Sequence, residues 1–150
     1  MDKAKLALEI QCELDQLRAL AQQSSRLLAV TPTYRREWDA VAGAKYVADV
    51  WMAVENLCKR RYAALEIPFP QGPDSHSRIL ADLLAAPHFA EHISANLSLR
   101  LKKYLAFRHR FTHGYEQIIM WSMVEEPLRH IPGTVTELTK IWADWLDSLP

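Results

Sequence analysis

Long segments with apolar residues at helical spacing, separated by clusters of proline, constrain the fold of this chain more than any other feature. In the first segment, about residues 3–29, leucine and isoleucine recur at intervals of three, four and seven positions. Such intervals bring apolar side chains to one face of an α-helix. No stretch alternates apolar and polar residues as a strand does, and we find no internal repeat. The sequence therefore predicts an all-α chain.

The proline clusters predict where the helices end. Thr31-Pro32-Thr33 closes the first segment and offers Thr31 or Thr33 as the N-cap of a second helix, about 34–65. The loop 66–75, EIPFPQGPDS, comes next. Four further segments follow: a short helix at about 76–86 capped by Asp74 or Ser75, a helix opened by Ser94, a helical stretch to about 126 that ends before Pro127, and a last helix set up by Pro132-Gly133-Thr134. Short connections between helices favour an antiparallel bundle, and we treat residues 1–150 as one domain.

Composition limits the possible partners and compartments. The formal net charge is zero, so any binding of nucleic acid requires a local basic patch. Cys12 and Cys58 lack metal-site spacing and lie beside apolar residues, so we expect both to be buried or half-buried thiols. The first residues carry charges throughout and contain no apolar core of a signal peptide. No apolar run approaches the length of a membrane span. We expect a cytoplasmic, soluble protein.

The stretch FRHRFTHGY at 107–115 concentrates cationic and titratable side chains. No acidic residue occurs between Glu91 and Glu116, whereas that interval contains Arg100, Lys102, Lys103, Arg108 and Arg110 with His92, His109 and His113. A second cluster is Lys59, Arg60 and Arg61. Phosphate is the natural partner of such strips, because arginine binds it through two hydrogen bonds. The alternative is a solvated helix face.

Helical geometry separates the side chains of this stretch into two ridges. Arg108, Thr112 and Tyr115 share one ridge, while His109 and His113 lie on the next. Arg108 and His113 are five positions apart, so their directions diverge by about 140° on an ideal helix. The long arginine side chain could bridge part of this angle, or the helix could deform at the following glycine. A second copy of the helix could instead complete the site across a dimer interface.

Two hypotheses for the histidines involve no proton transfer. His109 and His113 have the spacing of a zinc-binding pair, with a third ligand from Glu55, His92 or Glu116. No adjacent glutamate supplies a general base, however, and the flanking arginines would repel a dication. The histidines could also be structural, packed with Tyr104 and Phe111.

The third hypothesis is metal-free cleavage of RNA. Imidazole titrates near neutral pH, so His113 can act as general base or acid. The fixed charge of Arg108 would stabilise the negative charge that develops on phosphate. The 2′-hydroxyl of RNA supplies the nucleophile, which would explain why no nucleophilic serine or cysteine is evident.

Glu55 lies close to the apolar face of the second helix, and two interpretations remain open for it. It is either a boundary carboxylate paired with Lys59 or a buried carboxylate that orients a cationic site residue. His76, in the first turn of the following helix, has the position of a solvated or capping residue, so we assign it no chemistry.

These residues also carry a family resemblance. Residues 108–115 match the R-x4-H-x-Y pattern of HEPN ribonucleases, in particular the HepT-type toxins. Three further segments also resemble stretches of that family: YLAFRHRFTH, HSRILADLL and AVENLCKR. The resemblance therefore runs from the second helix to the end of the chain.

The resemblance implies a HEPN-type bundle that dimerises across the motif helix. It implies metal-independent RNA cleavage without a cofactor, with Arg108 and His113 as the central pair and His109 as a supporting residue. It also implies a partner, a minimal nucleotidyltransferase antitoxin that silences the toxin by transferring AMP to Tyr115. A nucleotide attached there would occupy the charged site and block RNA.

From charge, we predict that the cationic strip binds the phosphates of an RNA substrate, whether tRNA or mRNA. The residues assigned to this role are Arg100, Lys102, Lys103 and Arg110. The alternative function is a non-catalytic HEPN-like module that binds a nucleotidyltransferase or nucleic acid.

Overall fold

The computed structural model describes residues 1–113 and 118–150, and for His113 it describes the backbone alone. Within these residues the chain forms helices and contains no strand, which confirms the all-α prediction. No helix among them is both long and apolar enough to cross a membrane. The elements are α1 (Lys3–Leu28), the 3-10 helix η1 (Pro32–Tyr34), α2 (Glu37–Ala64), α3 (Ser75–Ala85), α4 (Pro87–His92), α5 (Ala95–His113), α6 (Trp121–Arg129) and α7 (Ile131–Ser148).

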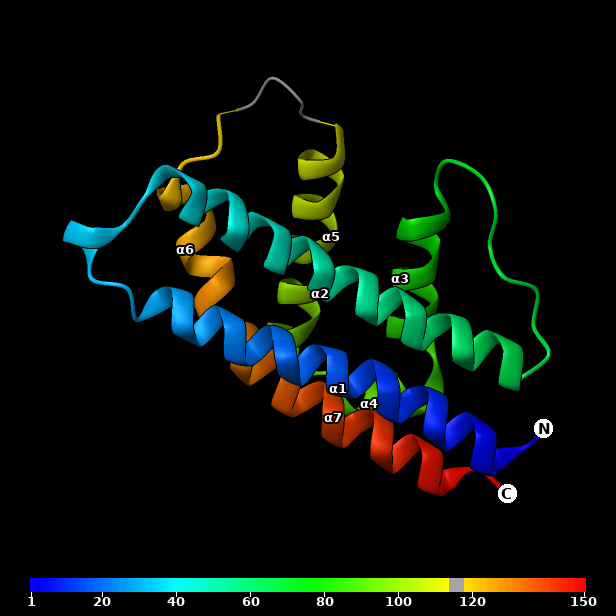
Figure 1. The fold of residues 1–150 in the computed structure, drawn as a ribbon. Helices are drawn as coiled ribbons and strands as arrows, with labels where there is room; N and C mark the ends of the chain where they lie inside the picture. The colour runs from blue at the N-terminus through cyan, green and yellow to red at the C-terminus, as the bar shows by residue number, and fades with distance from the viewer. Residues whose placement is uncertain (114–117) are drawn as a thin grey trace.

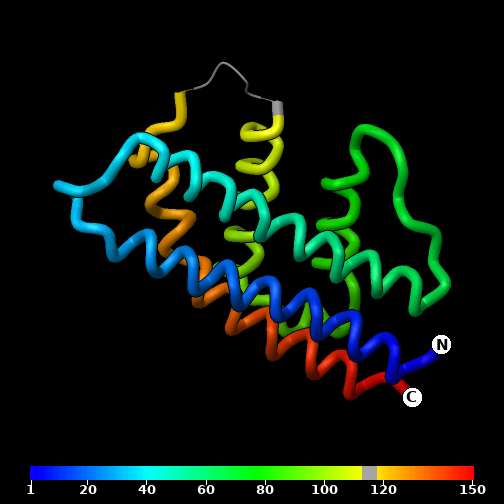
Figure 2. Tube along the Cα trace, in the orientation of Figure 1, coloured from blue at the N-terminus to red at the C-terminus, as the bar shows by residue number. Residues whose placement is uncertain are grey.

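The two long helices α1 and α2 run antiparallel to each other, and α7 lies along α1 (Figure 1). On the other side of α2 lie α5 and α6, and α3 contacts both α2 and α5 (Figures 1 and 2). The two ends of the chain are adjacent, since Lys3 Nζ donates to the carbonyl oxygen of Leu149 at 2.6 Å. The arrangement is a helical bundle in which α2 contacts helices on several sides.

The apolar faces predicted from spacing form the core of this bundle. In α1 the predicted residues are buried between the helices except Leu27, which is half-buried, and in α2 and α7 nearly all of them are buried. Trp51 of α2 and Trp142 of α7 are the largest fully buried side chains. The buried members of the predicted faces are Leu6, Ile10, Leu14, Leu17, Leu20, Val47, Val50, Val54, Leu57, Leu97, Leu101, Tyr104, Val135, Leu138, Ile141, Trp142 and Trp145.

The start of α2 differs from the prediction. Residues 32–34 form a 3-10 turn, and α2 begins at Glu37 rather than near residue 34. The N-cap is Arg36, whose backbone N–H donates to Asp39 Oδ2 at 2.8 Å, so the expected threonine cap is wrong. The start of α5 is as expected, because the Ser94 hydroxyl oxygen accepts a hydrogen bond from Leu97 N at 3.1 Å.

Two features near prolines also differ from the prediction. The short helix α4 was not predicted; it is held by Phe89, which is buried and whose ring centroid lies 4.7 Å from that of Trp142. The prediction that a helix ends before Pro127 is wrong, because Pro127 lies inside α6. The helix continues for two residues after it, and the first of them, Leu128, is fully buried. This burial offsets the backbone hydrogen bond that proline cannot make.

The two cysteines have different environments. Cys58 is buried as expected, and this burial raises the pKa of its thiol to about 12. Cys12 is exposed, so the expectation that both thiols are buried or half-buried is wrong for it. Its neighbour Ile10 faces the core, and two positions along a helix turn a side chain by about 200°.

At Gly43, α2 lies too close to α6 to leave room for a side chain. A Cβ atom at Gly43 would lie 2.6 Å from Val124 Cγ1, and the side chain of Val124 is fully buried. A β-branched side chain in a helix has essentially one rotamer, so it cannot turn away. The two helices therefore need a residue without a side chain at this position.

We expect the substitution Gly43→Ala to lower the free energy of unfolding by about 1–2 kcal/mol, because overpacking outweighs the gain in helix propensity. Gly133→Ala is the matched control, since the nearest atom to its added Cβ, Arg100 Nη1, is 4.0 Å away. Urea denaturation of both variants measures the difference. Equal stability of the two would show that α2 and α6 do not pack as closely as described.

Candidate active site

Residues 107–113 of the stretch that the sequence singled out form the last turns of α5. Arg108 is half-buried, and its Nε donates to Met52 Sδ of α2 at 3.0 Å. One turn later the Thr112 hydroxyl donates to the Arg108 carbonyl oxygen at 2.8 Å. The backbone of His113 ends the helix, while its side chain and the whole of Tyr115 lie outside the described residues. Arg108 is thus held against α2 by its side chain and by its helix.

A cleft of about 860 Å³ lies between α3 and α5, next to Arg108. Its apolar side chains include Leu80 and Leu84 of α3 and Leu105 of α5. Its basic members are His76, Lys102, Arg108, His109 and Arg110, and no acidic side chain of the described residues lines it. A concave surface with charge of one sign and apolar walls concentrates the opposite charge. The cleft therefore favours an anionic ligand.

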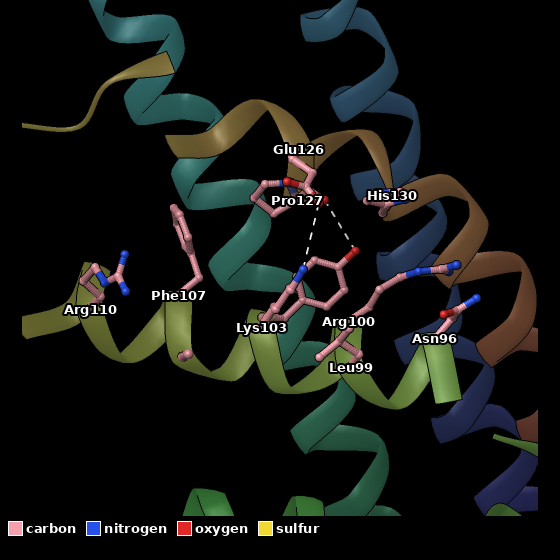
Figure 3. Close-up of a pocket in the computed structure, with 11 residues that line it drawn as sticks. Asn96, Leu99, Arg100, Lys103, Phe107, Arg110, Glu126, Pro127 and His130 are labelled. Carbon is pink, nitrogen blue, oxygen red and sulfur yellow. Dashed lines mark hydrogen bonds and ion pairs between the residues drawn. The ribbon is translucent and has the colours of Figure 1, made fainter. Parts of the chain in front are cut away.

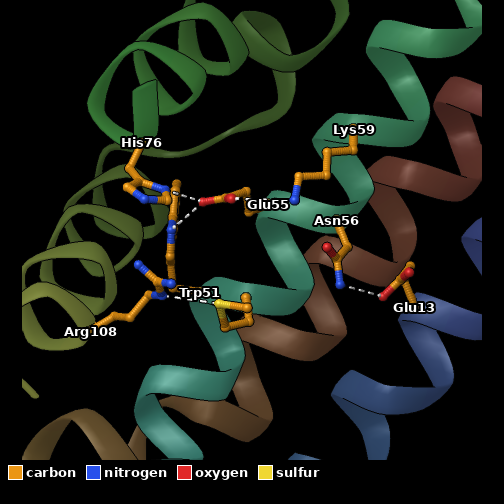
Figure 4. A network of polar contacts seen from close by, with 8 residues as sticks. Glu13, Trp51, Glu55, Asn56, Lys59, His76 and Arg108 are labelled. Carbon is orange, nitrogen blue, oxygen red and sulfur yellow. Dashed lines mark hydrogen bonds and ion pairs between the residues drawn. The ribbon is translucent and has the colours of Figure 1, made fainter. Parts of the chain in front are cut away.

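A buried carboxylate lies behind this cleft (Figure 4). Glu55 of α2 is only 6% exposed, and its Oε2 accepts a hydrogen bond from Trp51 Nε1 at 3.0 Å. The same oxygen lies 2.5 Å from His76 Nδ1 of α3. Lys59 Nζ approaches the other oxygen at 3.7 Å. Burial of a carboxylate is costly unless it is hydrogen-bonded and paired, and these three groups provide both.

Each interpretation of Glu55 from the sequence is confirmed in part: the ion pair and the burial are present, while the role of orienting a site residue stays a prediction. The pair with Lys59 is present, and the carboxylate is also buried against a residue that lines the cleft. That residue is His76, for which the sequence predicted no chemical role. The contact joins positions 21 apart on two helices, and no local spacing could have indicated it. The available signal was the carboxylate itself, which needed a partner on an otherwise apolar face.

Of the four cations predicted to bind phosphate, two form ion pairs with carboxylates of the chain and two line the cleft. Arg100 Nη1 lies 3.1 Å from Glu137 Oε2, and Lys103 Nζ lies 3.9 Å from Glu126 Oε1. Lys102 and Arg110 are exposed, line the cleft, and form no ion pair within the described part of the chain. The residues of the second basic cluster also have partners within the chain. Lys59 forms an ion pair with Glu55, and Arg60 forms ion pairs with Glu9 and Glu13. The guanidinium of Arg61 lies over the Phe89 ring.

A second pocket, of about 510 Å³, lies on the other side of α5 against α6 (Figure 3). Arg100, Lys103 and Phe107 line it together with His130. Arg110 lines this pocket as well as the cleft, so it lies where the two surfaces meet. The carboxylate of Glu126 faces Lys103 here, which makes this pocket less uniformly basic than the cleft.

Other roles proposed for the histidines find less support. His109 is exposed and lines the cleft, whereas Tyr104 is buried with its hydroxyl 3.2 Å from Thr134 Oγ1, so His109 is not packed into the core with it. His92 Nδ1 contacts the backbone oxygen of His88 at 2.7 Å. Among residues 1–113 and 118–150, no three side chains of the metal-ligating types are grouped to hold an ion. The candidate ligand Glu116 lies outside these residues.

Comparison with known families decides the affiliation. The model of the HepT-like protein family matches residues 42–149, which covers most of the chain. The chain belongs to the HepT-like family. The match begins within α2 and includes α3, the motif helix α5 and α7, so it contains every residue of the cleft. No curated protein and no solved structure matched the chain. Membership of this family suggests a HEPN-type toxin or ribonuclease module, and the all-α bundle is consistent with a HEPN-type fold.

Proposed function

We propose that this HepT-like protein is a metal-independent endoribonuclease toxin. The observation that carries the proposal is the cleft between α3 and α5, which collects five basic side chains and, among its described lining residues, no acidic one. The family membership supports the same class of activity. A cleft of this kind suits a chain of phosphates more than a neutral or cationic substrate.

The reaction needs few groups from the protein. The 2′-oxygen of RNA attacks the adjacent phosphorus, the bond from phosphorus to the 5′-oxygen breaks, and a 2′,3′-cyclic phosphate and a 5′-hydroxyl result. Arg108 stabilises the charge that builds up on the phosphate oxygens in the transition state. His113 transfers a proton, and His109, exposed in the same cleft, supports the binding of the substrate.

The site is proposed to be completed in a homodimer across α5. On an ideal helix, positions five apart, such as 108 and 113, diverge by about 140°, so we expect a single copy to present these two residues poorly to one phosphate. Two copies of α5 side by side would let Arg108 of one protomer and His113 of its partner face a common phosphate.

We expect Arg108→Ala and His113→Ala each to lower RNA cleavage in EDTA by more than about a hundredfold, because each removes a group that acts in the transition state. Arg129→Ala is the control, since Arg129 is an exposed arginine of α6 paired with Glu125. The measurement is the cleavage rate of total tRNA and of an mRNA transcript. Full activity of Arg108→Ala would contradict the proposal, and RNA binding without any cleavage by the unsubstituted protein would favour a binding module.

A second prediction follows from the difference between the two ion-paired cations and the two that line the cleft without an ion pair among the described residues. Lys102→Ala and Arg110→Ala should each flatten the salt dependence of RNA binding by about 0.7 in log–log slope, the value for one phosphate contact on a single strand. Arg100→Ala and Lys103→Ala should change it less, because carboxylates already neutralise these side chains. Affinity for 2′-O-methyl RNA, which cannot be cleaved, is measured across a salt series. Lys140→Ala is the control, because Lys140 does not line the cleft and is paired with Asp144.

Silencing by a nucleotidyltransferase antitoxin belongs to the same proposal, with RNA and this enzyme as the two partners. Tyr115 follows the end of α5 by two positions, so AMP attached to it would add a phosphate close to the basic end of that helix. Incubation with a minimal nucleotidyltransferase and ATP should raise the intact mass by one or more AMP groups and abolish cleavage. Tyr115→Phe should show neither effect, and unchanged activity after modification would contradict this role.

A further inference from the structure

The buried pair of Glu55 and His76 is not accounted for by a site built only from the residues of α5. His76 lines the same cleft as Arg108 and His109 but comes from α3 (Figure 4). Its side chain remains 37% exposed, while the carboxylate that it contacts is almost completely buried. The pair therefore connects the core of the protein to the floor of the cleft.

The chemistry of the contact fixes which nitrogen of His76 carries a proton. A carboxylate can only accept hydrogen bonds, so Nδ1 must donate to Glu55 Oε2. In the neutral ring Nε2 then carries the free lone pair, and among the described residues no group donates a hydrogen bond to it. Trp51 Nε1 and Lys59 Nζ hold the carboxylate from other sides, which restricts its movement. An imidazole oriented in this way is prepared to accept a proton at Nε2.

We propose that His76 is the general base of the RNA cleavage reaction and that Glu55 is its positioning residue. This inference rests on the proposed ribonuclease function and assigns His113 the opposite role. His76 Nε2 takes the proton of the 2′-hydroxyl as the 2′-oxygen bonds to phosphorus. The bond from phosphorus to the 5′-oxygen breaks, and His113 gives a proton to that leaving oxygen. Glu55 stabilises the imidazolium that His76 becomes, and Arg108 offsets the charge on the phosphate.

The matched variants are His76→Asn and His76→Gln. Asparagine places an amide nitrogen near the position of Nδ1 and can still donate to Glu55, but it offers no base at Nε2. Glutamine extends past this position. If His76 merely satisfied the buried carboxylate, asparagine would restore activity. If His76 is the base, both variants stay inactive although the protein folds, which circular dichroism and thermal unfolding verify.

The test that separates base from acid changes the leaving group. The unsubstituted protein first identifies a cleavage site in a tRNA or mRNA transcript. Short RNAs spanning that site are then made with either oxygen or sulfur at the bridging 5′ position, because a thiolate leaves without needing a proton. We expect His76→Asn to lower kcat by at least about a hundredfold on both RNAs with little change in KM. His113→Ala should lose activity on the oxygen RNA and regain most of it on the sulfur RNA.

Glu55→Gln tests the positioning residue. Its amide oxygen can still accept from Trp51 Nε1, so the fold should persist, while the negative charge next to the imidazolium is lost. We expect a smaller fall in kcat than for His76→Asn, again with little change in KM.

The outcomes distinguish this inference from the function on which it rests. If the unsubstituted protein cleaves RNA, Arg108→Ala does not, and His76→Asn keeps the full rate, the inference is overturned and the proposed function stands. Recovery of His76→Asn on the sulfur RNA would make His76 the acid and also overturn it. If the unsubstituted protein cleaves no RNA, both the function and the inference are rejected.

Discussion

The burial of α2 is the constraint on which the rest of the structure depends. This helix contacts α1, α3, α5 and α6, so its residues are covered on most of its circumference. Small residues allow the neighbours to come close, most clearly at Gly43, where α6 leaves no room for a side chain. A helix enclosed in this way can carry a polar group only if other elements satisfy it. Glu55 is such a group, and its partners determine how α3 is attached.

Polar contacts accompany the apolar packing between α3 and α2. His76 meets Glu55 at the start of α3, and the Tyr62 hydroxyl donates to Asp82 further along it. Ile79 and Leu83 are buried on the same helix. Because two polar contacts lie along α3, its rotation and distance relative to α2 are restricted, and with them the width of the cleft against α5. The requirement to satisfy one buried carboxylate therefore shapes the cleft that is proposed to receive the RNA.

The sequence predicted those features that depend on local spacing. Apolar residues repeated every three or four positions gave the helices and most of the core, and the composition of 107–115 identified the basic end of α5. Features decided by contacts between distant segments were not predicted. Pro127 lies within α6 because the burial of Leu128 after it offsets the lost backbone hydrogen bond, and α4 exists because Phe89 packs on Trp142. The involvement of His76 belongs to this second kind, since only the fold brings it to Glu55.

A chain of zero net charge can nevertheless present a strongly basic cleft, because its acidic residues are used elsewhere. Glu126 and Glu137 neutralise Lys103 and Arg100 on the α6 and α7 side of α5, and Glu55 is turned inward. On the opposite side of α5, none of the described residues that line the cleft is acidic, and Lys102 and Arg110 form no ion pair with the described part of the chain. The attraction for an anionic ligand is therefore local rather than global. It depends on a few side chains within about a Debye length of the cleft, so it can be strong at the site without making the whole protein bind nucleic acid.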